Sequence, residues 1–161
     1  MSKRAAIVLA AGQGTRMRSS RAKVLHEVLG RPMVGWVLDV ASRAGVDAFA
    51  IVVGHQAQEV EGWIASQFTD ADLQFCLQAQ QLGTGDAVRV ALDATADCDT
   101  VLILCGDTPA LDADAIEALI ADHEAANRDL TVASFYADDP TGYGRIVRDE
   151  DERVLRITEE R

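Results

Sequence analysis

The chain alternates between short apolar runs and longer segments whose apolar residues recur at helical spacing. Nearly apolar runs of this length are typical of parallel strands buried on both faces, and the repeated strand–helix–strand order requires right-handed crossovers. We therefore predict an α/β fold: a Rossmann-like, doubly wound, mostly parallel sheet with helices on both faces. Strands are expected at 4–10, 48–54, 73–78, 100–106 and 130–137, and a hairpin of two short strands within 143–149 and 153–160.

The expected helices have start and stop signals of their own. Pro32 can open the first helix and Gly45 can end it. Thr84 can cap the third helix and Asp112 the fourth, because both side chains accept hydrogen bonds from free N–H groups. No linker, low-complexity tract or repeat interrupts the order, so residues 1–161 are expected to form one domain. The helices are expected at 33–45, 56–68, 85–94 and 113–127.

Three polar, glycine-containing segments follow expected strands. They read LAAGQGTRM at 9–17, QAQQLGTG at 78–85 and CGDTPAL at 105–111. In a doubly wound sheet, ligands bind outside the carboxyl ends of the strands, which is where these segments fall. The sequence therefore predicts one site built from all three segments.

The first of these segments is suited to phosphate. Gly12 and Gly14 allow close backbone approach, so N–H groups can wrap a phosphate chain. The chain has no G-x-x-x-x-G-K-[ST] run, which excludes a P-loop, and Met17 stands where a dinucleotide fingerprint needs its third glycine. Arg16, with a forked donor, and Lys23, with a point charge, can complete a cage around a triphosphate.

The net charge of −11 is unevenly distributed. Residues 1–31 contain seven of the 15 basic residues and one acid, a local charge of +6, which leaves −17 on the rest. An acidic chain with one small basic segment argues against nucleic acid and membrane surfaces, and favours a compact anionic ligand. The apolar runs are too short to span a membrane, and the N-terminal run ends in a glycine-rich turn without a cleavage site, so the cytoplasm is the expected location.

Asp107 is the candidate metal ligand. It ends an apolar strand opposite the phosphate loop, and Mg²⁺ commonly takes one or two protein carboxylates together with water and phosphate oxygens. The alternative is an ordinary turn aspartate. Three scattered cysteines without C-x-x-C spacing indicate neither a disulfide framework nor a zinc site.

At this point the sequence resembles a known family. LAAGQGTRM, followed by AKVL and by a strand ending in GD, resembles the sugar-1-phosphate nucleotidylyltransferases. The closer resemblance is to the bacterial N-acetylglucosamine-1-phosphate uridylyltransferases, the N-terminal domain of a bifunctional protein, and it covers essentially the whole chain. The motifs that carry it are KVLHEVLGRPM at 23–33, QAQQLGTGDAV at 78–88, LCGDTPAL at 104–111 and DPTGYGRIVRD at 139–149.

The resemblance implies roles for particular residues. Arg16 and Lys23 would be catalytic and contact the nucleotide phosphates, and Gln78 would read the uracil edge, since an amide pairs with both a carbonyl and an N–H. Asp107 would hold Mg²⁺. The nucleotide-binding residues would be Leu9, Ala10, Ala11, Gly12, Gly14, Lys23, Gln78, Gly83 and Thr84, and the sugar-binding residues Gly144 and Glu159.

The implied reaction is attack by the phosphate oxygen of N-acetylglucosamine 1-phosphate on the α-phosphorus of UTP. UDP-N-acetylglucosamine, a cell-wall precursor, forms and pyrophosphate leaves. Because the nucleophile is already anionic, positioning and charge stabilisation would supply most of the rate. The alternatives are another sugar-1-phosphate nucleotidylyltransferase and a non-catalytic nucleotide-binding fragment.

The chain departs from the family pattern in length and at Ala22. The family's domain continues past Glu159 and supplies further sugar contacts and a second metal ligand, so we expect the domain to be incomplete and weakly active or inactive alone. The family's acetyltransferase β-helix, which organises a homotrimer, is not expected here. Ala22 replaces the usual proline before Lys23, which should loosen that turn.

Overall fold

The computed structural model of the protein describes residues 2–14 and 17–160. It divides into two compact units, Met1–Asp129 and Leu130–Arg161, each of which is described by itself. That residues 1–161 form one domain stays a prediction. Within the described ranges, no helix is long and apolar enough to cross a membrane.

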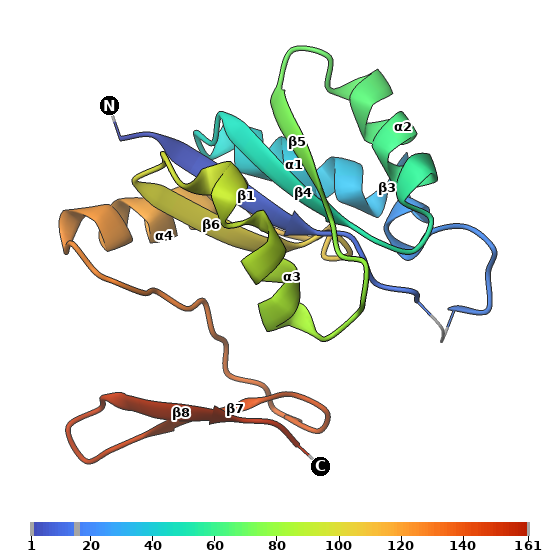
Figure 1. Cartoon of the computed structure of the whole chain (residues 1–161). Coiled ribbons are helices and arrows are strands. Elements are labelled where there is room, and N and C mark those ends of the chain that lie inside the picture. Colours follow the sequence, from blue (N-terminus) through green and yellow to red (C-terminus); the bar gives the residue numbers. More distant parts are fainter. Residues whose placement is uncertain (1, 15–16, 161) are drawn as a thin grey trace. The chain divides into compact units, whose positions relative to one another are not determined.

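A parallel sheet forms the centre of the first unit. Its strands are β1 (Arg4–Leu9), β4 (Ala48–Val53), β5 (Asp72–Leu77) and β6 (Thr100–Cys105). They lie in the order β5-β4-β1-β6, and every neighbouring pair is parallel, which confirms four of the predicted strands (Figure 1). Ile7 and Val8 of the inner strand β1 have no exposed surface. A strand buried on both faces needs apolar side chains on both faces, which explains the unbroken apolar run of β1.

Helices cover both faces of this sheet (Figure 1). Val37, Ile64 and Ile116, one from each of three helices, share a core with one face. Ala87 and Ala91 of the remaining helix pack on the other face against β1 and β4. The arrangement is the doubly wound one predicted from the sequence. The helices are α1 (Met33–Arg43), α2 (Ala57–Gln67), α3 (Thr84–Ala91) and α4 (Ala113–Ala125).

One predicted helix cap is confirmed and another is wrong. The carboxylate of Asp112 accepts a hydrogen bond from the backbone N–H of Asp114 at 3.0 Å and so caps α4. Thr84 does not cap α3; it is the first helical residue, and Gly83 occupies the cap position without a side-chain hydrogen bond. Gly83 has φ +105°, a conformation open mainly to glycine. The cap position is therefore occupied by this glycine and not by the threonine that follows it.

The strand order contains a switch point beside β1. From β1 the chain moves outward through β4 to β5, and then returns to place β6 on the other side of β1. The helices α1, α2 and α4 lie on one face, whereas α3, which connects β5 to β6, lies on the other. The carboxyl ends of β1 and β6, where the strand order reverses, are where the doubly wound fold positions a ligand.

The connection from β1 to α1 has structure that the sequence pattern did not indicate. It contains the 3₁₀ turn η2 (Lys23–Leu25) and a two-residue antiparallel ladder between β2 (Glu27–Val28) and β3 (Arg31–Pro32). Val24 and Leu25 are buried in the core. Burial of these two side chains anchors the turn, and with it the backbone of Lys23, to the core of the first unit.

The second unit contains a hairpin and an extended segment. β7 (Arg145–Arg148) and β8 (Val154–Thr158) pair antiparallel, which confirms the predicted hairpin. The predicted strand at 130–137 is wrong, because that segment has no regular structure and Leu130, Val132 and Phe135 are exposed. Alternating apolar residues make a strand only where a neighbouring strand supplies hydrogen bonds, and β7 and β8 pair with each other.

Candidate functional site

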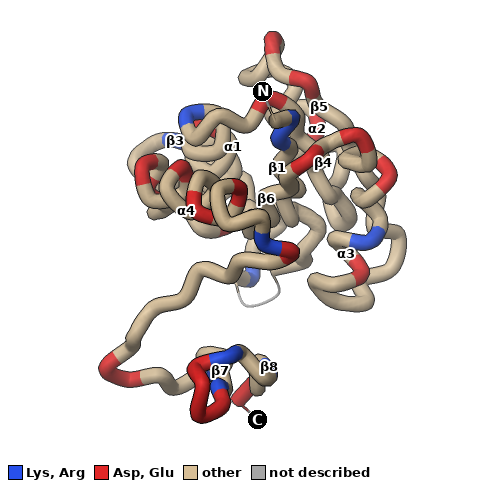
Figure 2. The backbone as a smooth tube through the Cα atoms, turned by 90° about the vertical axis from the view of Figure 1, so that its left-hand side faces the viewer, with Lys and Arg blue, Asp and Glu red and all other residues tan. Residues whose placement is uncertain are grey.

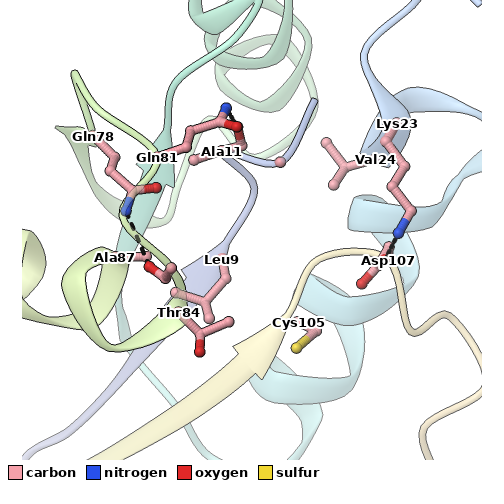
Figure 3. Close-up of a pocket in the computed structure, with 12 residues that line it drawn as sticks. Leu9, Ala11, Lys23, Val24, Gln78, Gln81, Thr84, Ala87, Cys105 and Asp107 are labelled. Carbon is pink, nitrogen blue, oxygen red and sulfur yellow. Dashed lines mark hydrogen bonds and ion pairs between the residues drawn. The ribbon is translucent and has the colours of Figure 1, made fainter. Parts of the chain in front are cut away.

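A pocket of about 410 Å³ opens where the three polar segments meet (Figure 3). The connections after β1 and β6, the loop before α3 and the turn η2 all contribute to it. It therefore lies at the carboxyl ends of the strands, where the sequence predicted that the three segments meet, and at the switch point of the sheet. Its lining consists of Leu9, Ala11, Gly12, Lys23, Val24, Gln78, Gln81, Gly83, Thr84, Ala87, Cys105 and Asp107.

Of the residues at the carboxyl end of β1 that the sequence assigned to the nucleotide, some line the pocket and one does not. Leu9, Ala11 and Gly12 line the pocket. Ala10 does not, because its side chain is buried in the core and its N–H donates to the Val52 carbonyl at 2.8 Å. An added Cβ at Gly12 would meet no atom within 4 Å, so this glycine leaves open space beside the pocket.

Gly14 lies against Lys23 and not on the pocket wall. Its φ is +60°, and an added Cβ would stand 2.8 Å from the Cβ of Lys23. Glycine is therefore required here twice, for the backbone conformation and for the close approach of the lysine stem. Arg16, which the sequence assigns to the phosphates, lies outside the described residues.

Lys23 and Asp107 lie next to each other on one wall of the pocket and form an ion pair (Figure 3). Both side chains are about three-tenths exposed, so solvent and ligands can reach them. Asp107 is held there by Gly106, whose N–H donates to the Leu9 carbonyl at 2.9 Å. An added Cβ at Gly106 would stand 3.0 Å from that carbonyl oxygen, which accounts for the glycine before the aspartate.

Gln78 is a buried polar residue on the pocket wall, with 5% of its surface exposed. Its backbone N–H donates to the Val53 carbonyl at 2.8 Å, continuing the ladder beyond β5. Its side-chain Nε2 donates to the Gly83 carbonyl at 3.1 Å and to the Asp86 carboxylate at 2.9 Å. With both N–H groups engaged, the carbonyl oxygen is what the amide can offer to a ligand.

Gln81 is a pocket residue that the sequence interpretation missed. Its Nε2 donates to the Ala11 carbonyl at 2.6 Å and so ties the loop before α3 to the loop after β1 (Figure 3). The available signal was a further amide in QAQQLGTG, three residues after Gln78. Val24, Ala87 and Cys105 were also missed, and as apolar or weakly polar residues they gave no comparable signal.

The basic residues near the N-terminus do not form one cluster. Lys3 and Arg4 stand at the amino end of β1, roughly 20 Å from its far end at about 3.3 Å per residue. There they pair with Asp97 and Glu124, and Figure 2 marks Lys and Arg at separate places on the first unit. Among the described residues, Lys23 alone brings a positive side chain to the pocket lining.

The described residues fit a magnesium ion bound together with a nucleotide. Asp107 brings the carboxylate to the lining, and no group of three or more His, Cys, Asp and Glu in the described ranges could enclose a metal. Mg²⁺ that binds nucleotide takes much of its coordination from water and phosphate oxygens, so one protein carboxylate suits it. The ammonium of Lys23 already lies on this carboxylate, which shows that the position accommodates a cation.

The two residues assigned to the sugar lie together in the second unit. An added Cβ at Gly144 would stand 3.6 Å from a carboxylate oxygen of Glu159 and 3.3 Å from Ile157. The β7–β8 hairpin brings them together, because Arg145 pairs with Thr158 in its ladder. The absence of a side chain at Gly144 leaves the Glu159 carboxylate open on that side.

Comparison with known proteins gives a family, relatives and solved structures. Residues 6–158 match the model of the MobA-like NTP transferase domain. The chain is 49% identical over 158 residues to the bifunctional protein GlmU of Trichlorobacter lovleyi, and 49% identical over 159 residues to that of Pelobacter propionicus. Each match covers 98% of the chain but 34% of the relative, so the chain spans about a third of their length.

Two solved structures resemble the fold. A nucleotidyl transferase from Methanothermobacter thermautotroptrophicus matches with a TM-score of 0.65 and 26% identity, over 75% of this chain and 57% of the other. The protein Rv0371c from Mycobacterium tuberculosis matches with a TM-score of 0.63 and 26% identity, over 78% of this chain and 62% of the other. Both agree with the doubly wound sheet.

Proposed function

The chain belongs to the family of MobA-like NTP transferase domains, and we propose that this nucleotidyltransferase moves a uridylyl group from UTP to N-acetylglucosamine 1-phosphate. The observation that carries the proposal is the pocket at the switch point of the sheet. It brings Lys23 and Asp107 to one wall and Gln78 with Gly83 to another. One wall thus suits phosphates and the other suits a base, as a nucleoside triphosphate requires.

The phosphate wall would act through charge and position. Lys23 is the positive group at the pocket, and its ammonium would contact the phosphates of UTP while Gly12 lets the chain of phosphates approach the backbone. A nonbridging oxygen of the sugar phosphate attacks the α-phosphorus, the bond to the β-phosphate breaks, and pyrophosphate leaves. No general base is needed, since the attacking oxygen is already anionic. Arg16 is the second proposed catalytic cation of this loop.

Asp107 would hold Mg²⁺ between protein and phosphates. When bound, the ion neutralises charge that develops on the leaving phosphate oxygens. The role of the chain is to keep the Asp107 carboxylate at the end of β6, where the Gly106–Leu9 hydrogen bond fixes it. Lys23 would leave its ion pair with Asp107 and turn to phosphate as the charged nucleotide enters.

The base wall would recognise uracil. Gln78 offers a carbonyl oxygen, and the backbone N–H groups near Gly83 and Thr84 begin α3, where free donors are expected. An acceptor beside donors matches the uracil edge, which presents an N–H between two carbonyl oxygens. Gly144 and Glu159 are the proposed contacts to the amino sugar, with Glu159 accepting hydrogen bonds from hydroxyl groups.

A chimaera tests the proposal. Residues 1–158 replace the matching third of the Trichlorobacter lovleyi relative, and pyrophosphate release is measured with UTP, N-acetylglucosamine 1-phosphate and Mg²⁺. We expect turnover that Lys23→Ala lowers by about a hundredfold or more, whereas Lys3→Ala, the matched lysine at the opposite end of β1, leaves it unchanged. Equal turnover with CTP or TTP would contradict the uracil assignment and favour a different nucleotidylyltransferase.

The 161-residue chain itself is expected to bind UTP but to turn it over weakly or not at all. Binding without turnover, both alone and in the chimaera, would favour a non-catalytic nucleotide-binding module. We propose the cytoplasm as the location, where nucleoside triphosphates and sugar phosphates occur together. A homotrimer is the proposed assembly of a longer protein that includes a β-helix, with neither nucleic acid nor a membrane as partner.

A further inference from the structure

Asp86 lies in the first turn of α3 and is absent from the pocket lining, yet it contacts the pocket through Gln78. Its Oδ2 accepts a hydrogen bond from the Nε2 of Gln78 at 2.9 Å. The Gly83 carbonyl accepts the second one from the same nitrogen at 3.1 Å. Both hydrogens of the amide therefore point away from the ligand, and Figure 3 shows the oxygen of Gln78 turned toward the open space of the pocket.

The amide cannot turn over without a penalty. A flipped Gln78 would place its carbonyl oxygen against the Asp86 carboxylate and the Gly83 carbonyl, both of which only accept hydrogen bonds. It would also leave its N–H groups to find partners in a half-enclosed pocket, which is costly for a residue that is 5% exposed. The orientation of the amide is thus set by two acceptors, of which only Asp86 is a side chain that mutation can remove.

Asp86 is itself held in place and held ionised. Arg89, one turn along α3, donates to its Oδ1 at 2.6 Å, which leaves Oδ2 for Gln78. The hydrogen bonds from Gln78 and from Arg89 lower the pKa of the Asp86 carboxyl, so it remains an acceptor at neutral pH. The side chain of Asp86 is 14% exposed, so water competes little for it.

We propose that Asp86 is a positioning residue for base selection: it fixes Gln78 so that the base meets a carbonyl oxygen and not an NH₂ group. This rests on the proposed uridylyl transfer and deepens it. The 3-position of uracil carries an N–H that donates to this oxygen, whereas the same position of cytosine carries a lone pair that repels it. A free amide would rotate and accept either base, so discrimination between UTP and CTP depends on a carboxylate that touches neither.

The test compares the binding of UTP and CTP to the 161-residue chain by calorimetry, in the presence of Mg²⁺. We expect Asp86→Ala to lower the Kd of CTP divided by the Kd of UTP by about tenfold. UTP should bind more weakly and CTP more tightly than in the wild type. Asp86→Asn should keep most of the selectivity, because its side-chain carbonyl can still accept from Gln78. Asp93→Ala removes an exposed carboxylate beyond the same helix and serves as the matched control.

Several outcomes overturn the proposal. Asp86→Ala that weakens UTP and CTP equally would show that Asp86 only stabilises the loop. Asp86→Ala with unchanged preference for UTP would show that Gln78 is oriented without it. A wild-type chain that binds UTP no better than CTP would overturn the uracil assignment itself, and that failure appears before any variant is made.

A second measurement does not depend on affinity. In the wild type the two side-chain amide protons of Gln78 both donate, so they should exchange slowly with water in NMR spectra. Asp86→Asn should keep them protected, and Asp86→Ala should make them exchange faster while the backbone amides of β4 stay protected. Equal exchange of the Gln78 side chain in wild type and Asp86→Ala would contradict the proposal even if the alanine variant were less stable.

Discussion

The ammonium of Lys23 and the carboxylate of Asp107 neutralise each other in the pocket, although one is assigned to phosphate and the other to metal. The pair holds two functional groups at the site without leaving either charge alone. A nucleotide–metal complex supplies an anion for Lys23 and a cation for Asp107. Its binding would therefore exchange one ion pair for two, with little loss of charge balance.

Asp107→Asn is expected to have opposite effects without and with Mg²⁺. Without the metal, the variant should bind UTP about threefold more tightly, because Lys23 is freed and a carboxylate no longer repels the phosphates. With Mg²⁺, the metal should strengthen UTP binding less than it does in the wild type. Calorimetric titration with UTP in EDTA and in Mg²⁺ measures both.

The matched control for that prediction is Asp97→Asn, which breaks the pair with Lys3 at the other end of β1. It changes the net charge by the same amount and should leave both titrations unchanged. If Asp97→Asn tightened UTP binding as much as Asp107→Asn does, long-range charge and not the pocket pair would be the cause.

The ion pair between Arg4 and Glu124 predicts a pH-dependent stability. Arg4 donates two hydrogen bonds to Glu124, at 2.6 and 2.8 Å, and they lower the pKa of that carboxyl from 4.5 to about 2. Because the folded-state pKa is depressed, the stabilisation is complete above the unfolded value and is lost as the pH falls toward about 2. Since both side chains are about a quarter exposed, we expect Glu124→Gln to cost about 1 kcal/mol at neutral pH.

Urea unfolding of wild type and Glu124→Gln from neutral pH down to the acid limit checks this. The difference in the free energy of unfolding should shrink below the unfolded pKa, and Glu117→Gln, an exposed position on the same helix, should show little difference throughout. A cost for Glu124→Gln that is the same at every pH would mean that packing, and not ionisation, supplies it.

Removal of the Asp112 cap of α4 should lower the stability of the protein by the same amount at every pH near neutrality. Asp112→Ala removes the acceptor of the Asp114 N–H and should lower the free energy of unfolding by about 1 kcal/mol, seen as a lower Tm. Asp112→Ser keeps an oxygen at the same position and should recover most of the loss. An equal loss for serine and alanine would show that the carboxylate acts through the helix dipole and not through the hydrogen bond.

The extended segment at 130–137 predicts a site of limited proteolysis. Phe135 is 68% exposed and Tyr136 is fully exposed, in backbone without helix or strand. Chymotrypsin should cut first after one of these two residues and leave a resistant product that contains the first unit. Mass spectrometry of a time course identifies the cut, and the double variant Phe135→Ala, Tyr136→Ala should slow it. A first cut inside α1 or β4 would contradict the division into units.

Local sequence patterns predicted the parallel sheet because each of its strands is an apolar run that can be recognised within a short window of sequence. The same reasoning failed at 130–137, where the alternation is equally clear but no partner strand pairs with it. Pairing is a property of distant segments, and a single window of sequence does not contain it. Gly83 shows the same limit at small scale, because the preference of threonine for caps was overridden by a backbone angle that only the tertiary turn imposes.

The motifs at the strand ends, together with the family resemblance, also named most residues of the pocket lining. It placed the basic residues in one group because they are close in sequence, yet β1 carries Lys3 and Arg4 to the far end of the sheet. It passed over Gln81, whose partner is a backbone carbonyl 70 residues away. Contacts to backbone atoms leave little trace in residue identity, so such a residue is found only once the loops are seen together.

The two units have a consequence for how specificity can change. The residues proposed for the nucleotide lie before Asp129, and those proposed for the sugar lie after Leu130. If these proposals hold, each specificity is encoded in its own uninterrupted stretch of chain. A recombination near residue 130 would exchange the acceptor sugar while it preserves the donor base, so new pairings of base and sugar can arise without rebuilding either site.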